Sequence, residues 1–553
     1  MRAANGKLML TMGSVVLFIV FASVFVIMEG CQEVKKEVQQ PVSGQLTSHA
    51  PVPAILPDSL YVGTATCGEC HQQEMQQWQH SHHDEAMQPA TAQTVKGDFN
   101  DSRYSNAGVK YRFFTTDGQF YVNTEGPDGT YQDFKIDYTF GTEPLQQYMV
   151  KFPGGRYQCL RAAWDTEKNK WFDLYPDMKL ATGEWLHWTK GGMNWNTMCA
   201  DCHSTNLRKN YDPGSDAFHT EFAIMDVSCE SCHGPGKAHA DAARQPGFDP
   251  AAYDAKTHLY LTSGLPNTEQ VAQCARCHMR REQISPAYNH QGHLMDHYIP
   301  EILRDDLYFA DGQILDEDYV YGSFIQSKMY HQGVKCTDCH NAHSLELKAM
   351  DNTLCTQCHA PQEYDVEAHH LHGVNTEAAQ CINCHMTGRF YMGNDFRRDH
   401  SFRVPRPDLS VKFGTPNACN GCHTDQSAQW AANKVVEWYG PDRDPHYSEA
   451  LAAGSTRTPE AVPQLEGLVR DRQQPAIARA TAMWYLGQLV SPEQSAVFAE
   501  ALRDPDPLVR YHAVTAQAWL PLQERAARLG PLLKDPRRAV RIAAAEALAE
   551  VTP

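Results

Sequence analysis

The sequence has little positive charge and only one long apolar run. Lys and Arg number 48 against 66 Asp and Glu, so the formal net charge is −18 at pH 7. Chains that bind nucleic acid need a basic surface, so nucleic acid is not expected as a partner. The apolar run covers residues 8–28, contains no charged residue, and is long enough to cross a bilayer.

Spare cysteines are equally scarce. Sixteen of the eighteen cysteines belong to one repeated motif, Cys-x-x-Cys-His, which leaves only Cys31 and Cys159. No disulfide framework is therefore expected. The motif cysteines are Cys67 and Cys70, Cys199 and Cys202, Cys229 and Cys232, Cys274 and Cys277, Cys336 and Cys339, Cys355 and Cys358, Cys381 and Cys384, and Cys419 and Cys422.

This motif is the attachment site of c-type haem, where two thiols join the porphyrin edge and the next residue puts imidazole on the iron. A single copy would also suit half a zinc site or a redox dithiol. Eight copies, each followed by His, favour eight covalently attached haem c groups. The expected proximal ligands are His71, His203, His233, His278, His340, His359, His385 and His423.

The distal ligand decides what each haem does. A second His gives a haem that only passes electrons, whereas an open position lets a substrate reach the iron. Nineteen of the 27 histidines lie outside the motifs, an excess that favours bis-His ligation. The candidates chosen from their positions near motifs are His239, His343, His400, His83, His187, His297, His331 and His372. His369 and His370 stand beside His372 in one cluster.

Residues 1–30 are predicted to be a signal or anchor segment, with Arg2 and Lys7 before the apolar run. Met28-Glu-Gly-Cys31 resembles a bacterial lipobox, so the alternatives are a lipidated Cys31 and an uncleaved helical anchor. Residues 31–60 are polar and rich in proline, as in a flexible linker. Haem is attached outside the energy-transducing membrane, so we expect an exported, membrane-tethered protein that is periplasmic or on the cell surface.

The remaining chain is predicted to be mainly α, with porphyrins as the core of an octahaem domain at 61–440. A small antiparallel β insertion is expected at about 105–175, from alternating runs at 111–114, 119–123, 131–138 and 148–152. Cys159 is expected to be a small buried residue in a strand.

Residues 450–553 are predicted to form a short HEAT-like α-solenoid. The stretch Leu502–Arg510 recurs at Leu533–Arg541, and a weaker copy begins at Leu468. Three repeats suit a scaffold, which would dock a protein partner. Deleting residues 450–553 is expected to leave the haem spectrum intact.

The motif surroundings resemble the bacterial multihaem c-type cytochromes that group with tetrahaem nitrifier cytochrome c, hydroxylamine oxidoreductase and pentahaem nitrite reductase, of the kind with C-terminal repeats. The resemblance lies in residues 61–83, 194–206, 227–239, 322–343 and 398–402. It implies close-packed haem pairs that form an electron wire. The Cys-x-x-Cys-Lys motif common in nitrite reductase is absent, and no local signature marks a cross-linked tyrosine as in hydroxylamine oxidoreductase.

Two functions follow as hypotheses. The first is a non-catalytic electron-transfer protein whose eight haems, mostly bis-His, serve redox protein partners. The second is an oxidoreductase that acts on a small nitrogen or sulfur compound at one open haem.

Overall fold

The computed structural model describes residues 56–262, 264–285, 288–290, 292–493 and 495–549. The predicted signal or anchor segment at 1–30 lies outside these residues, as do Cys31 and most of the predicted linker. In the part that is described, no helix combines the length and the apolar content needed to cross a membrane.

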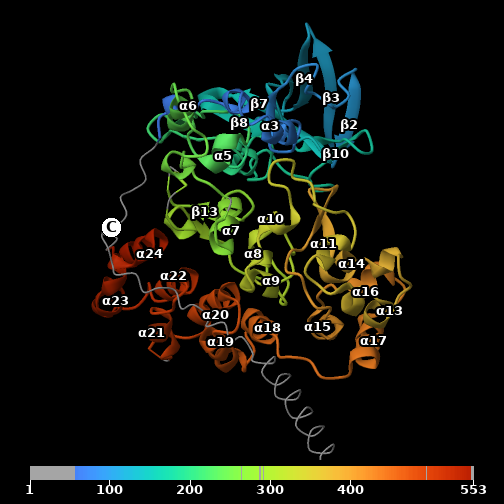
Figure 1. Ribbon diagram of the computed structural model, residues 1–553, viewed down its shortest axis with the longest axis vertical. Helices are drawn as coiled ribbons and strands as arrows, with labels where there is room; N and C mark the ends of the chain where they lie inside the picture. The colour runs from blue at the N-terminus through green and yellow to red at the C-terminus, as the bar shows by residue number, and fades with distance from the viewer. Residues whose placement is uncertain (1–55, 263, 286–287, 291, 494, 550–553) are drawn as a thin grey trace, which may run out of the picture. The chain divides into compact units, whose positions relative to one another are not determined.

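Strands occupy mainly the blue and cyan part of the chain in Figure 1, and their described pairings are antiparallel. One sheet has the order β1-β6-β7-β9-β10, with β8 paired to β7, and a second has the order β2-β3-β4-β5. The strands of these two sheets are β1 (Met87–Pro89), β2 (Ser102–Asn106), β3 (Val109–Thr116), β4 (Gln119–Glu125), β5 (Tyr131–Lys135), β6 (Tyr138–Phe140), β7 (Leu145–Phe152), β8 (Arg156–Cys159), β9 (Ala162–Asp165) and β10 (Lys170–Asp173).

The hairpin between β3 and β4 has the predicted turn. Thr116 pairs with Gln119, so Asp117 and Gly118 form a two-residue loop, and both have a positive φ. Asp-Gly adopts this conformation readily, and its twist matches that of the strands. The predicted run 131–138 is wrong as one strand, because it splits into β5 and β6, which belong to different sheets.

An apolar core lies under these two sheets. Phe113 of β3 stacks on Trp171 of β10 with ring centres 3.5 Å apart, and Phe99 meets both rings edge to face. Cys159 is 2% exposed at the end of β8 and belongs to the same core.

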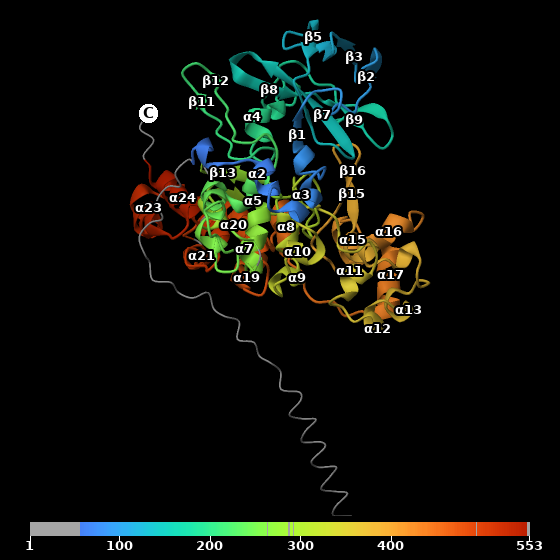
Figure 2. The same ribbon diagram turned by 45° about the horizontal axis from the view of Figure 1, so that its top comes forward.

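Short helices are spread along the remaining chain as far as residue 425 (Figure 2). They are α2 (Thr64–Gly68), α3 (Gln72–Trp78), α4 (Trp195–Met198), α5 (Cys229–His233), α6 (Lys237–Ala243), α7 (Asn267–Ala275), α8 (Tyr321–Phe324), α9 (Lys328–His331), α10 (Cys336–Cys339), α11 (Thr353–Thr356), α12 (Pro361–Tyr364), α13 (Glu367–His370), α14 (Cys381–His385), α15 (Pro407–Phe413) and α16 (Ala418–Cys422). Three two-stranded ribbons separate them: β11 (Tyr211–Asp212) with β12 (Ala217–Phe218), β13 (Arg281–Gln283) with β14 (Tyr298–Pro300), and β15 (Gly388–Tyr391) with β16 (Asp395–Arg398).

The expectation of a mainly α chain is not confirmed, since the structure has 37% helix and 16% strand. Much of the haem-motif region is irregular, and most of its helices have only four or five residues. Sequence periodicity detects long helices well and cannot detect turns of this length.

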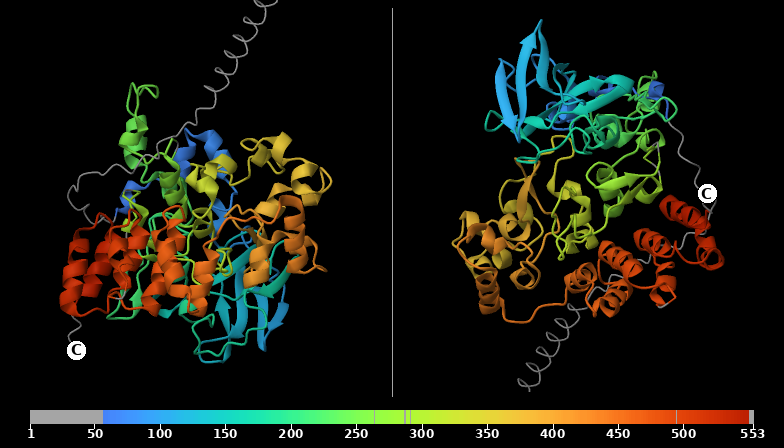
Figure 3. Two further views of the ribbon diagram at one scale, coloured as in Figure 1. Left: turned by 90° about the horizontal axis from the view of Figure 1, so that it is seen from below. Right: turned by 180° about the vertical axis from the view of Figure 1, so that it is seen from behind.

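Longer helices follow residue 425. The first, α17 (Ala428–Tyr439), packs on α15, and those after it stand side by side in the left view of Figure 3. The later ones are α18 (Ser448–Thr456), α19 (Ala461–Arg470), α20 (Ala476–Leu489), α21 (Val497–Ala501), α22 (Pro507–Thr515), α23 (Leu522–Leu529) and α24 (Arg538–Leu548). In this set α18 packs on α19, α19 on α20, α20 on α22 and α22 on α24, as in a repeat array.

Buried ion pairs link one repeat to the next. Arg479 of α20 pairs with Asp504 at 2.5 Å, and Arg510 of α22 pairs with Asp535 at 2.8 Å. These residues occupy matching places in the repeated sequence, so each Arg meets the Asp that precedes the next repeat's second helix. Such pairs fix the register of the stack, because leaving one partner unpaired in the interior is costly.

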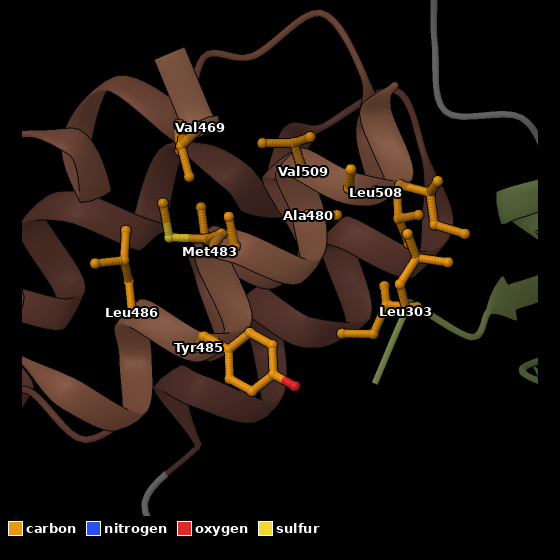
Figure 4. Close-up of a cluster of buried hydrophobic side chains, with 14 of the residues drawn as sticks. Leu303, Val469, Ala480, Met483, Tyr485, Leu486, Leu508 and Val509 are labelled. Atoms are coloured by element: carbon orange, nitrogen blue, oxygen red, sulfur yellow. The ribbon is translucent and has the colours of Figure 1, made fainter. Parts of the chain in front are cut away.

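The repeats share one apolar core with the segment at residues 295–314. That core joins Ile302, Leu303 and Leu307 to side chains of the repeat helices, including Met483 and Leu486 (Figure 4). The Leu303 amide also donates to Thr481 Oγ1 at 3.0 Å. The repeat helices therefore do not form an independent module, and we now expect their deletion to destabilise the haem-bearing region.

Replacing Leu303 with Ala should lower the free energy of unfolding by about 2–5 kcal/mol, because it removes a buried side chain shared by both parts. Thermal unfolding followed by circular dichroism and by haem absorbance should shift together. Leu533→Ala is the matched control, since Leu533 is 43% exposed. An unchanged melting temperature for Leu303→Ala would contradict the shared core.

His512 of α22 makes stability depend on pH. Both of its ring nitrogens are buried without a hydrogen-bond partner, and burial lowers its pKa to about 3. The unfolded chain gains a proton near the usual value of about 6.5, so stability falls as the pH drops from 6.5 toward 3. By pH 5 the loss is about 2 kcal/mol.

His512→Leu should flatten this pH dependence in denaturant titrations between pH 7 and pH 5. His219→Leu is the control. Because His219 is exposed, this variant should keep the wild-type dependence of stability on pH.

Candidate haem centres

The eight motifs adopt the same local geometry. In six of them the His amide donates to the carbonyl of the first Cys, for example from His71 to Cys67 at 2.9 Å and from His423 to Cys419 at 2.8 Å. In the other two, α5 and α14 contain the whole motif. One helical turn thus places both thiols and the imidazole on one side of the backbone.

Apolar side chains are few around the later motifs. Between residues 325 and 425, all of which the structure describes, the buried apolar side chains are Ala379, Tyr391, Pro407 and Leu409. A folded region of this length normally needs a larger core. The sparse packing is what a region with porphyrins for its core requires, so the chain fits the haems that its motifs predict.

Histidines from distant segments face five of the motif histidines. A metal–imidazole bond is about 2 Å and the ring centre lies about 1 Å beyond it, so two imidazoles on opposite faces of one iron have centres about 6 Å apart. The observed ring-centre distances are 6.1 Å for His71 with His239, 6.3 Å for His278 with His83, 6.5 Å for His340 with His400, 6.3 Å for His385 with His369, and 6.3 Å for His423 with His372.

Hydrogen bonds to Nδ1 leave Nε2 free to bind iron. Several rings donate Nδ1–H to a backbone carbonyl: His203 to Ala86 at 3.0 Å, His233 to Tyr260 at 3.1 Å, His385 to Arg403 at 2.7 Å, His400 to Arg398 at 2.9 Å and His372 to His370 at 2.5 Å. Such bonds fix the tautomer and the orientation of metal-bound histidines. Burial also lowers the pKa of His83 and of His278 to about 4, which keeps both rings neutral at pH 7.

Five of the eight predicted distal histidines are placed beside motifs. His239, His83, His400 and His372 belong to the pairs above, and His343 lies near enough to His233 to lower its pKa further after burial. His369, which faces His385, belongs to the same predicted cluster as His372. The cluster was visible in the sequence, but nothing there separates its members.

Three other candidates have neighbours other than motif histidines. His187 bonds Thr189 Oγ1 through Nδ1 at 2.8 Å, His297 lies against Tyr288, and His331 packs on Tyr330. No described histidine ring lies 6.1–6.5 Å from the rings of His203 or His359. Their ring neighbours within that distance are Phe140 and Tyr364.

Comparison with known proteins supports the cofactor and the repeats. Residues 66–109 and 163–234 match the family model of cytochrome c554 and c-prime, which includes the first three motifs. Residues 472–549 match the model of HEAT repeats. The chain is a multihaem c-type cytochrome with C-terminal HEAT repeats.

Two solved structures are similar to this cytochrome at low sequence identity. The outer cell wall cytochrome OcwA shares 16% identity, with a TM-score of 0.47 over 89% of this chain and 100% of that chain. The octaheme sulfite reductase MccA of Wolinella succinogenes, form II, shares 12% identity, with a TM-score of 0.32 over 90% of this chain and 84% of that chain. No curated protein sequence matches the cytochrome.

Contacts between motifs arrange them in a row. Helix α2 packs on α5, α7 on α10, and α14 on α16, which join the first motif to the third, the fourth to the fifth, and the seventh to the eighth. Arg281 follows the fourth motif and pairs with Asp201 of the second at 2.5 Å, which places the second motif beside the fourth.

Polar side chains bridge other neighbours in the row. Gln273 donates to the Cys232 carbonyl at 2.8 Å, between the fourth and third motifs, and Gln357 donates to the Asp338 carbonyl at 3.3 Å, between the sixth and fifth. The Cys381 amide donates to Asn352 Oδ1 at 2.9 Å, between the seventh and sixth. The order is therefore first, third, fourth, fifth, sixth, seventh and eighth, with the second beside the fourth.

His239→Ala should remove one axial nitrogen from the first haem. We expect one low-spin signal in the electron paramagnetic resonance (EPR) spectrum to be replaced by a high-spin signal, with unchanged haem content because the thioether bonds remain. The exposed His219, changed to Ala, should keep the wild-type spectrum. A wild-type spectrum for His239→Ala would contradict the pairing of His71 with His239.

Proposed function

We propose that this cytochrome binds eight c-type haems, one at each motif, and carries electrons along their row. Facing histidines at five motifs are the observation that supports this most directly. Iron with imidazole on both faces has no position for a substrate and changes only its oxidation state. Most of the haems would then be relays.

The contacts between motifs support the same function. Each contact joins helices that carry thiols bound to the porphyrin edge, so neighbouring porphyrins would lie edge to edge or face to face. The first and eighth motifs would be the ends of the row, where electrons enter or leave.

The net charge and the sequence of the N-terminal segment are the basis for the rest of the proposal. The net charge of −18, to which haem propionates add, suits donor and acceptor proteins with basic surfaces. We infer that the protein works outside the cytoplasmic membrane, in the periplasm or on the cell surface, tethered through its N-terminal segment or a lipidated Cys31. The outer surface of the HEAT repeats is a candidate docking site for a partner.

A second function is favoured by the surroundings of the second motif, at which no described histidine faces His203. Tyr319 lies beside this motif with a positive φ of 60°, and the Arg397 guanidinium is 5.9 Å from the centre of its ring. The side chain of Tyr319 is 40% exposed and lies near Glu317 and the thiols of Cys202 and Cys199. A phenol and a guanidinium beside an open iron could bind a small nitrogen or sulfur compound.

Mass and spectra of the purified protein test both functions. The mass in excess of the polypeptide should equal that of eight haems. EPR of the oxidised protein with and without nitrite, and absorbance of the reduced protein with carbon monoxide, then separate the two. The relay function predicts low-spin iron whose EPR and absorbance spectra do not change when nitrite or carbon monoxide is added. One high-spin signal that shifts with nitrite would establish the second function, and a colourless protein would refute both.

A further inference from the structure

A buried carboxylate connects the first motif to the third. Glu230 is the first inner residue of Cys229-Glu-Ser-Cys232 and is 2% exposed. One of its oxygens accepts from the Val62 amide at 3.0 Å and from the Gly236 amide at 2.6 Å. The other accepts from the Gly63 amide at 2.9 Å and from the Val62 amide at 3.2 Å.

These amides belong to the two segments that carry the axial ligands of the first haem. Gly63 is the N-cap of α2, which leads through Cys67 to His71. Gly236 is the N-cap of α6, which carries His239. One side chain of the third motif thus holds both ends of the His71–His239 pair.

The backbone on both sides is shaped for this close approach. Gly63 has a φ of 80°, a conformation that residues with a side chain rarely adopt. A Cβ on Gly236 would lie 3.1 Å from Glu230 Oε1 and 3.1 Å from Val62 Cγ2, tighter than ordinary van der Waals contact. Glycine at these positions brings three amides to one carboxylate.

We propose that Glu230 is a positioning residue that fixes the axial geometry of the first haem and its placement against the third. This inference rests on the proposed haem loading. Because the rate of electron transfer falls steeply with distance, such a clamp would set the coupling at one end of the row. Its buried negative charge would also favour ferric over ferrous iron nearby and so lower the reduction potential.

Glu230→Gln tests the charge and the geometry together. The side chain keeps its size, but it loses the charge, and its NH2 group meets an amide N–H instead of accepting from it. We expect the low-spin EPR signal that disappears in His239→Ala to shift, and the potential of at least one haem to rise in a spectroelectrochemical titration.

Glu69→Gln is the matched control. Glu69 lies inside the first motif but is 61% exposed, and it pairs with Arg244 on the surface at 2.8 Å. Removing this charge should leave the EPR signal in place and the potentials close to those of the wild type, because water screens an exposed charge.

Gly236→Ala perturbs the same contact by changing the residue that donates to Glu230. It serves as a second test if Glu230→Gln does not fold. The added methyl group pushes on Glu230 and Val62, so the same EPR signal should shift while the charge remains. Haem content should be measured by mass for the wild type and for every variant. A wild-type protein without haem would contradict the proposed function itself, not the role of Glu230. Full haem content together with wild-type EPR and potentials in Glu230→Gln, or in Gly236→Ala if the former is not obtained, would overturn the role of Glu230.

Discussion

Under the proposed haem loading, the structure meets one geometric demand, that two imidazole nitrogens reach one iron from opposite faces. The facing pairs bring together points far apart in the sequence, such as His83 with His278 or His71 with His239. Joined through iron, such pairs would act on the chain as covalent cross-links do, because they would restrict the conformations of long loops. They would then hold the fold of the region between residues 325 and 425, where few apolar side chains are buried.

A second set of contacts works with the first. Under the proposed loading, the two thiols and the imidazole of each motif bind the haem, so the inner residues and the residues that flank the motif are left to contact neighbouring motifs. Glu230, Asp338, Gln273 and Asn352 occupy such positions, and their hydrogen bonds run from motif to motif. The residues that the motif formula leaves variable would thus help to determine which haems are neighbours.

The sequence predicts what is local. The proximal ligands, the Asp117–Gly118 turn and the repeat that begins at Leu502 each need only a few adjacent residues. The distal pairing is not local, since the residue that faces His385 depends on how α13 and α14 meet, and the sequence offered His369, His370 and His372 equally. His187, His297 and His331 show the same difficulty, because proximity to a motif along the chain says little about proximity in space.

The sequence also does not predict what the repeat helices pack against, and the reason is physical. The pattern at residues 450–553 shows that the helices have an apolar face, but not what covers that face. The structure shows residues 295–314 against it, and the Arg479–Asp504 and Arg510–Asp535 pairs hold the helices in register behind them. The apolar face is therefore committed within the chain, and a docking partner would meet the polar side.

The core shared by residues 295–314 and the repeats also affects the order in which the protein folds during synthesis. A ribosome makes the N-terminal part first, so Leu303 and its neighbours stay uncovered until the repeat helices at residues 448–548 have been made. The eight motifs precede these helices in the sequence. Enzymes that attach haem would thus meet a chain in which this core is still open, and the repeat helices would cover it only after the eight motifs have been made.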